Sequence, residues 1–170
     1  ARLSREREGT LECAKNLRDM LNRSISVCDP YAGVGPSLAP LVNEPDLLSN
    51  LFASDLNPAA VELLRENISA SYAEIECTDA RTLHERNELC GKFDLLLVNI
   101  PHDTLEHLPH LLPLLNDGGT VRGWAVIEEE DLQAAREVLA NTLGKSVEIE
   151  VRRSYSATAN LCRFESKIHH

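Results

Sequence analysis

Short apolar runs alternate with helical segments along most of this 170-residue chain, and this alternation constrains the fold more than any other feature. It predicts strand–helix–strand units whose right-handed crossovers build a parallel sheet with helices on both faces. Five such strands are expected, over 25–29, 51–55, 73–77, 93–99 and 118–128. The run FDLLLVN (93–99) is almost wholly apolar, which is typical of a central strand covered on both faces.

The segments between these strands carry helix signals. The strongest is 57–71, where Asn57 is suited to cap a helix and Pro58 to occupy its first position. Other helices are expected over 4–22, 36–42, 80–89, 104–115 and 129–144. Residues 145–156 and 160–168 alternate apolar and polar side chains and predict an antiparallel hairpin. The predicted fold class is therefore α/β: a doubly wound, mostly parallel seven-stranded sheet with a C-terminal antiparallel hairpin.

Polar side chains follow the first four predicted strands at the same point of each unit. Asp29, Asp55 and Asn99 end their strands, and Asp79 comes just after the third strand. The carboxyl ends of parallel strands share one edge of the sheet, where doubly wound folds bind ligands. Each of these residues by itself is equally consistent with a helix cap or a turn. Four of them in register along one edge favour a binding site.

A glycine turn follows the first strand, in the stretch VCDPYAGVGP (27–36). It lacks the full dinucleotide-binding spacing, because Leu38 stands where a third small residue is needed, and it lacks the ending of a phosphate loop. Gly33 and Gly35 still allow the backbone to approach a ligand closely. Asp55, at the end of the second strand, is suited to the two hydroxyls of a ribose.

The charge balance argues against a domain that binds nucleic acid by itself. The chain holds 17 basic and 27 acidic residues, a net charge of −10, whereas phosphate contacts require a basic surface. RNA is not excluded as a substrate, because a partner domain can supply the affinity. No apolar run approaches the roughly 18 residues of a membrane span, so no membrane partner is expected.

Five cysteines, an odd number without a C-x-x-C pair, fit neither a disulfide framework nor a zinc site. We expect Cys28, Cys77 and Cys162 to be buried, reduced thiols. Reduced thiols indicate a cytoplasmic protein.

Three histidines raise the question of a metal. His107 and His110 are spaced to share a helix face, and His102 lies nearby in the sequence. No carboxylate or cysteine completes a convincing ligand set, so surface or capping roles are favoured and no metal is expected.

Six short motifs, in order along nearly the whole chain, resemble those of class I S-adenosylmethionine-dependent methyltransferases. More narrowly, they resemble the archaeal and eukaryotic tRNA (guanine-N1) methyltransferases and their sister family, the aminocarboxypropyl transferases of wybutosine synthesis. The motifs are RLSRER (2–7), DPYAGVGP (29–36), SDLNPAAVELLRENI (54–68), TDAR (78–81), NIPHDTLEHL (99–108) and VRRSYSATANLCRFESKI (151–168). The resemblance implies a Rossmann-like methyltransferase fold and S-adenosylmethionine as the cofactor.

The resemblance also implies how the methionine end of the cofactor would be held. Asp29 would lie near its amino group, with 32–35 wrapping around it, and Asn99 and Pro101 would border the site of methyl transfer. The expected cofactor-binding residues are Asp29, Tyr31, Ala32, Gly33, Val34, Gly35, Asp55, Leu56, Asn57, Asp79, Ala80, Asn99 and Pro101.

At the nucleoside end, the resemblance gives Asp55 the ribose and places Leu56 beside the adenine. Asp79 and Ala80 would then contact the adenine amino group.

The expected catalytic residues are Glu6, Arg2 and Asn99. By resemblance, Glu6 falls on the family's general base and Arg2 on the arginine that supports it. Guanine N1 carries a proton that must leave as the methyl group arrives, and a carboxylate can accept it. An arginine near O6 would stabilise the negative charge that develops there. Without the resemblance, RLSRER would be interpreted as a solvated first helical turn.

Together these residues predict an S-adenosylmethionine-dependent methyltransferase that methylates N1 of a guanine in tRNA. Three alternatives use the same cofactor fold: an aminocarboxypropyl transferase acting on tRNA, a methyltransferase acting on a small molecule or protein, and a cofactor-binding module without catalytic activity. The first of these three breaks a different carbon–sulfur bond of the cofactor.

Residues 1–170 are expected to form a single catalytic domain, with an N-terminal helix over 1–22 and a closing hairpin over 145–168. tRNA is the expected partner, and it is expected to need an extra recognition domain, because the tRNA-methylating enzymes that the chain resembles carry such domains at their N-termini. The sequence leaves the oligomeric state open.

Overall fold

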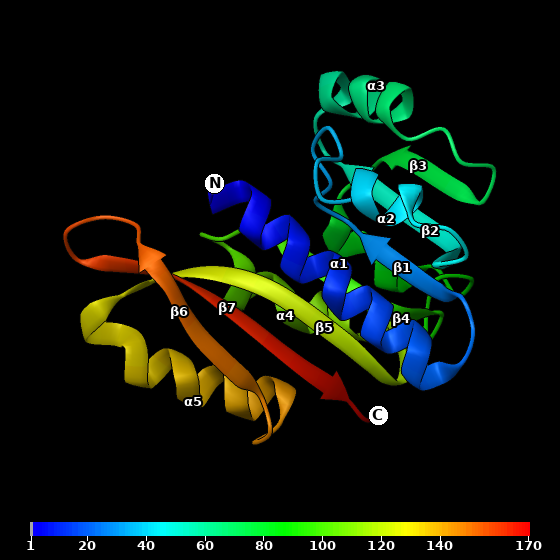
Figure 1. Ribbon diagram of the computed structural model, residues 1–170. Coiled ribbons are helices and arrows are strands. Elements are labelled where there is room, and N and C mark those ends of the chain that lie inside the picture. Colours follow the sequence, from blue (N-terminus) through cyan, green and yellow to red (C-terminus); the bar gives the residue numbers. More distant parts are fainter. Residues whose placement is uncertain (1) are drawn as a thin grey trace.

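One sheet of seven strands organises the molecule (Figure 1). The computed structural model describes the backbone of residues 2–170 and the side chains of residues 6–170. The strands are β1 (Ile25–Asp29), β2 (Leu48–Asp55), β3 (Ala73–Cys77), β4 (Phe93–Asn99), β5 (Leu115–Glu128), β6 (Glu148–Ser154) and β7 (Ala159–Ile168). Their order across the sheet is β3-β2-β1-β4-β5-β7-β6.

The pairing within the sheet confirms the predicted fold class. Strands β1 to β5 are parallel to one another, whereas β7 is antiparallel to both β5 and β6. The last two strands are therefore the expected hairpin, and β7 lies inside the sheet between β5 and β6. Strand β4 is buried along its whole length except at Asn99, as its apolar sequence predicted.

Helices cover both faces of the sheet. The α-helices are α1 (Arg2–Leu21), α2 (Ala39–Asn43), α3 (Pro58–Asn67), α4 (Thr104–Leu111) and α5 (Leu132–Leu143), and short 3₁₀ segments are η1 (Ala80–Glu85), η2 (Leu112–Leu114) and η3 (Glu129–Asp131). Helices α1, α2 and α3 pack on one face, and η1, α4 and α5 pack on the other. Alternate residues of the central strands supply the two cores, such as Leu95 and Leu97 on one face and Leu96 and Val98 on the other.

Several predicted helices are shorter than expected. The segment expected over 80–89 is only a 3₁₀ turn, which begins where the Asp79 side chain accepts a hydrogen bond from the backbone N–H of Arg81. The α-helix expected over 104–115 ends at Leu111 and continues as the 3₁₀ turn η2, because Pro113 has no N–H to donate to the carbonyl of Pro109. The helix after Asn57 begins as predicted, since the Asn57 side chain accepts from Ala59 N, but it ends at Asn67.

All five cysteines are free thiols. Cys28 and Cys162 are buried as expected, but the prediction for Cys77 is wrong: Cys77 is exposed, because it ends β3, the edge strand of the sheet. Within residues 2–170, none of the helices has the length and apolar character needed to cross a membrane.

Candidate active site

The sheet order reverses direction between β1 and β4. From β1 the chain proceeds to β2 and β3 on one side, and from β4 it proceeds to β5 on the other. The crevice outside the carboxyl ends of two such strands is where doubly wound sheets bind ligands. Asp29 ends β1 and Asn99 ends β4, so both residues lie at this switch point, and Asp55 ends the neighbouring strand β2.

The glycine turn after β1 is tied to the end of β2. Gly33 and Gly35 have φ angles of 58° and 90°, in the left-handed region that favours glycine. Asp55 accepts a hydrogen bond from Gly33 N on Oδ2 and one from Asn57 N on Oδ1, each at 3.0 Å. The packing against α3 also requires a glycine, because a Cβ on Gly35 would lie 2.8 Å from Leu64 Cδ1.

A cavity of about 270 Å³, here called the Asp55 cavity, opens beside this turn. Six of the expected cofactor-binding residues line it: Tyr31, Asp55, Leu56, Asp79, Ala80 and Asn99. Leu56 presents an apolar side chain that is 67% exposed, which leaves a flat ring room to pack against it. The Asp79 carboxylate is already held by Arg81 at 2.9 Å, and hydrogen bonds from Arg81 hold the Asp79 pKa below its usual range.

Asp29 is a buried carboxyl group at the carboxyl end of β1. It is 4% exposed, and burial together with the nearby charge of Asp55 raises its pKa to about 7, although a hydrogen bond from Tyr31 N acts in the opposite direction. A cationic group placed beside Asp29 would favour its ionised form. Asp29 is therefore suited to an ammonium group.

A second cavity, of about 380 Å³, contains Glu6 and is here called the Glu6 cavity. It is lined by Glu6, Arg7, Pro36, Ser37, Asn99, Pro101, His102, Trp124, Val126, Arg153, Tyr155 and Leu161. Asn99 lines both cavities. The glycine turn also spans them, because Pro30 and Tyr31 line the Asp55 cavity while Pro36 and Ser37 line the Glu6 cavity.

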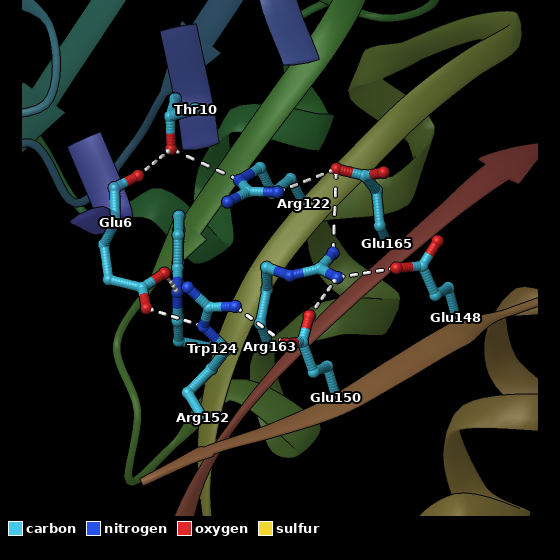
Figure 2. A network of polar contacts seen from close by, with 9 residues as sticks. All are labelled: Glu6, Thr10, Arg122, Trp124, Glu148, Glu150, Arg152, Arg163 and Glu165. Carbon is cyan, nitrogen blue, oxygen red and sulfur yellow. Dashed lines mark hydrogen bonds and ion pairs between the residues drawn. The ribbon is translucent and has the colours of Figure 1, made fainter. Parts of the chain in front are cut away.

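Two side chains from distant parts of the sequence hold the Glu6 carboxylate (Figure 2). Arg152 Nε donates to Oε1 at 2.8 Å, and Trp124 Nε1 donates to Oε2 at 3.0 Å. Burial raises the pKa of Glu6, but the hydrogen bonds from Arg152 and Trp124 outweigh it, so the Glu6 pKa lies below its usual value. Glu6 is therefore ionised at neutral pH and can accept a further hydrogen bond, since a carboxylate has about four acceptor positions.

Sequence reasoning missed both partners of Glu6. Trp124 is 6% exposed, as a core residue of a strand would be, but its indole N–H donates to Glu6. A buried tryptophan usually finds a hydrogen-bond acceptor, and this rule is the one signal that pointed to a polar partner. Arg2 begins α1, but its side chain lies outside the described residues. In the described part of the chain, the arginine in contact with Glu6 is Arg152.

Some expected cofactor-binding residues line neither cavity: Asp29, Ala32, Gly33, Val34, Gly35 and Asn57. The turn residues among them shape the backbone between the two cavities, whereas Asn57 caps α3. The Pro101 carbonyl, one candidate acceptor for a substrate, already accepts a hydrogen bond from Val126 N at 2.9 Å.

The histidines make side-chain contacts instead of a cluster. His107 Nδ1 lies 2.8 Å from the hydroxyl of Tyr31, and His102 Nε2 lies 3.0 Å from the hydroxyl of Tyr155. Among residues whose side chains the structure describes, no three metal-ligating groups come together.

Comparison with known proteins identifies related sequences and folds. A family model described as the TRM5/TYW2 methyltransferase domain matches residues 6–151. The tRNA (guanine(37)-N(1))-methyltransferase Trm5b of Pyrococcus abyssi is 33% identical over 132 residues, which cover 75% of this chain and 38% of that protein. The chain thus spans well under half the length of this relative.

Solved structures share the fold. The crystal structure of Trm5b from Pyrococcus abyssi superposes with a TM-score of 0.72 at 26% identity, covering 99% of this chain and 49% of that one. The crystal structure of M. jannaschii TYW2 in complex with AdoMet has a TM-score of 0.72 at 21% identity, covering 94% of this chain and 75% of that one. With a family match over most of its length and this fold, the chain belongs to the TRM5/TYW2 methyltransferase domain family.

Proposed function

We propose that this chain is the catalytic part of an S-adenosylmethionine-dependent methyltransferase that methylates N1 of a guanine in tRNA. The observation that carries the proposal is the position of Asn99, which lines both the Asp55 cavity and the Glu6 cavity. One cavity carries groups suited to a nucleoside, the other carries an ionised carboxylate, and the two meet at the end of β4. A group transferred from one ligand to the other would pass this junction.

The residues of the Asp55 cavity fit S-adenosylmethionine. Each Asp55 oxygen accepts one backbone N–H and retains an acceptor position for a ribose hydroxyl. Leu56 offers an apolar surface to the adenine, and Asp29, beyond the cavity wall, suits the ammonium group of the methionine part. The glycine turn leads from the Asp55 cavity to the Glu6 cavity, so its backbone can follow the length of the cofactor.

The residues of the Glu6 cavity suit a nucleobase that must lose a proton. When bound, S-adenosylmethionine supplies a methyl group that is electrophilic because it is attached to a sulfonium. The carbon–sulfur bond breaks as the bond to guanine N1 forms, and Glu6 accepts the proton that leaves N1. Arg152, which is in contact with Glu6, lines a different pocket, so the cations at the Glu6 cavity that can stabilise negative charge on the neighbouring O6 are Arg7 and Arg153.

Two arginines at the Glu6 cavity favour the proposal of a nucleic-acid substrate, although the net charge of the chain is −10. Arg7 and Arg153 line the Glu6 cavity, and within the part of the chain whose side chains are described neither forms an ion pair with a carboxylate. Most of the other buried or half-buried arginines are paired, including Arg122, Arg152 and Arg163. Guanidinium groups left unpaired at the cavity are suited to the phosphates that flank a target nucleotide.

The tRNA substrate agrees with the name of the Pyrococcus abyssi relative, which is a tRNA (guanine(37)-N(1))-methyltransferase. We also propose that tRNA binding needs an extra recognition domain, because this chain covers only 38% of that relative and is acidic overall. We place the protein in the cytoplasm, where its five free thiols would stay reduced.

The test is transfer of a labelled methyl group from S-adenosylmethionine to unmodified tRNA, compared with the same tRNA lacking the guanine after the anticodon. We expect guanine-dependent incorporation by the complete gene product. Incorporation that ignores the guanine, or none at all with cofactor binding intact by calorimetry, would overturn the proposed substrate.

Aminocarboxypropyl transfer is the second candidate, because the matching family model covers the TYW2 proteins as well. Cofactor labelled separately on the methyl group and on the carboxyl carbon distinguishes the two reactions. Methylation transfers only the first label to tRNA. The ionised Glu6 carboxylate favours methylation, since N1 of guanine must give up a proton.

A further inference from the structure

Glu6 lies in a contact between three segments that are far apart in the sequence. Glu6 comes from α1, Trp124 from β5 and Arg152 from β6, and Figure 2 shows their side chains converging. The two hydrogen bonds engage different oxygens of the carboxylate, at 2.8 Å and 3.0 Å, so they fix its plane as well as its position. The Glu6 and Arg152 side chains are 22% and 13% exposed.

The guanidinium of Arg152 also contacts a second carboxylate, on the side away from Glu6. Its Nη1 donates to Glu150 Oε1 at 2.8 Å, and the other oxygen of Glu150 accepts from Arg163 Nη2 at 3.0 Å. Arg163 also donates to Glu148 at 2.6 Å and its side chain is 7% exposed. The guanidinium of Arg152 is therefore fixed at two of its nitrogens, one facing Glu6 and one facing this network.

The backbone of Glu6 is tied to the same part of the sheet. Thr10 Oγ1 donates to the carbonyl oxygen of Glu6 at 3.1 Å and accepts from Arg122 Nε at 3.2 Å. Arg122 Nη1 in turn donates to Glu165 Oε1 on β7 at 2.9 Å. Both the backbone and the carboxylate of Glu6 are thus anchored to β5, β6 and β7, which restricts where the carboxylate can point.

This arrangement has a consequence for proton transfer. An unrestrained glutamate has many rotamers and loses side-chain entropy when it is fixed in one of them. Catalysis requires the base within hydrogen-bond distance of the proton it removes. A partner that fixes the carboxylate before substrate arrives reduces the free energy needed to reach that geometry.

We propose that Arg152 is a positioning residue that holds the Glu6 carboxylate in the Glu6 cavity, and that the closing hairpin through Glu150 and Arg163 keeps Arg152 in place. The inference rests on the proposed function, in which Glu6 is the base. It adds that residues of the hairpin, far from Glu6 in the sequence, set the geometry and the acidity of that base.

The first test measures Glu6 directly, with ¹³C-labelled glutamate and NMR titration of the carboxyl groups without any tRNA. Arg152→Gln removes the charge beside Glu6 but leaves Glu6 buried, so we expect the Glu6 titration midpoint to move upward. The charged groups that remain near it are Arg122 on β5, Arg7 on its own helix and Arg153 on β6, and the titratable side chains of His102 and Tyr155 also line the cavity. Arg86→Gln is the matched control: it removes a half-buried, ion-paired arginine that contacts Glu76 on β3 and touches neither Glu6 nor its network, and the midpoint should stay within a few tenths of a pH unit.

The second test follows catalysis. For Arg152→Gln we expect kcat to fall at least tenfold and the acidic limb of the pH–rate profile to move to higher pH, with cofactor affinity unchanged. Arg152→Lys keeps the charge and the fold and should recover part of kcat. It also serves as the second variant if Arg152→Gln is poorly folded.

The outcomes separate the two proposals. Equal effects of Arg152→Gln and Arg86→Gln on the Glu6 titration, or no effect of either, would refute the positioning role of Arg152. If the unaltered complete protein transfers no methyl group to tRNA, the proposed function fails, and the titration alone then decides whether Arg152 holds Glu6.

Discussion

The carboxylate of Asp55 accepts a hydrogen bond from the backbone N–H of Gly33 at 3.0 Å, which joins the end of β2 to the glycine turn that follows β1. Its second oxygen accepts from Asn57 N at the start of α3. One side chain therefore fixes the turn, the helix start and the wall of the Asp55 cavity together. This arrangement leaves Asp55 in place before any ligand binds.

Asp55→Ala should weaken S-adenosylmethionine binding by about 10- to 100-fold. A hydrogen bond to a charged group contributes about 1.5–3 kcal/mol, and a tenfold change in affinity corresponds to about 1.4 kcal/mol. Isothermal calorimetry measures the change. The control is Asp117→Ala, which removes an exposed carboxylate near the N-terminal end of β5, away from the carboxyl edge of the sheet. This variant should leave the affinity unchanged. Unaltered affinity in Asp55→Ala would remove Asp55 from the ribose site.

Cofactor binding should strengthen as the pH rises through about 7. Asp29 has a pKa of about 7 in the folded protein, so it is largely protonated below that value and ionised above it. Only the ionised form attracts the ammonium group of the cofactor, and binding below pH 7 should therefore release a proton. Calorimetry in buffers of different ionisation enthalpy counts that proton. Asp29→Asn should abolish the pH dependence, and a pH dependence that survives in Asp29→Asn would assign it to another group.

The Asp29 carboxyl group also affects the free energy of unfolding of the ligand-free protein. Its folded-state pKa is raised above the value of about 3.8 in the unfolded chain. Between these values the folded state binds the proton that the unfolded state has lost, so the free energy of unfolding should fall as the pH rises from about 4 to about 7. Asp29→Asn should flatten this part of the curve in urea denaturation.

Glu6→Gln should reduce kcat by a factor on the order of 10² to 10⁴, the usual contribution of a general base. The amide keeps the shape of the side chain but does not accept the proton from guanine N1. Cofactor affinity should not change, because Glu6 does not line the Asp55 cavity.

The matched control for this variant is Glu8→Gln, an exposed residue two positions further along α1 that lines a different surface. It should retain full methyl transfer. Activity retained in Glu6→Gln would exclude Glu6 as the base and turn attention to the remaining polar groups of the Glu6 cavity.

The fold was predictable because its signals are local. Apolar runs and helix caps predicted the seven strands and the strong helix after Asn57, and the polar strand ends predicted the places of Asp55 and Asn99 at the carboxyl edge of the sheet. Leu56 and Asp79 also line the Asp55 cavity as expected. Asn57 caps α3 as predicted, and its expected contact with the cofactor stays a prediction.

The partners of Glu6 were not predictable because they depend on tertiary structure. Trp124 and Arg152 lie 118 and 146 residues away from Glu6 in the sequence. The apolar sequence of the β5 segment and the alternating sequence of the β6 segment each indicate a strand, but neither pattern says which residue faces α1. Only the pairing of β5, β7 and β6 brings the tryptophan and the arginine to the same carboxylate.

Gly35→Ala should destabilise the protein more than Gly91→Ala. Both glycines have positive φ, 90° and 66°, so alanine at either position costs about 1–2 kcal/mol of backbone strain. At Gly35 the new Cβ would also lie 2.8 Å from buried Leu64, whereas at Gly91 it would meet no atom within 4 Å. Overpacking adds about 1–3 kcal/mol. Urea denaturation of both variants measures the difference, and equal losses would show that the turn moves to relieve the contact.

Arg7→Gln and Arg153→Gln should each reduce the salt dependence of tRNA binding. If each guanidinium neutralises one phosphate beside the target guanine, the slope of log K against log salt should decrease in magnitude by roughly 0.7–0.9 per variant. The complete gene product and tRNA are compared at several salt concentrations, with Lys145→Gln, an exposed residue just before β6, as the control. Both arginines line the Glu6 cavity and neither lines the Asp55 cavity, so cofactor affinity should not change. Unchanged slopes in both variants would mean that other residues contact the phosphates and that the unpaired arginines at the Glu6 cavity have no part in binding tRNA.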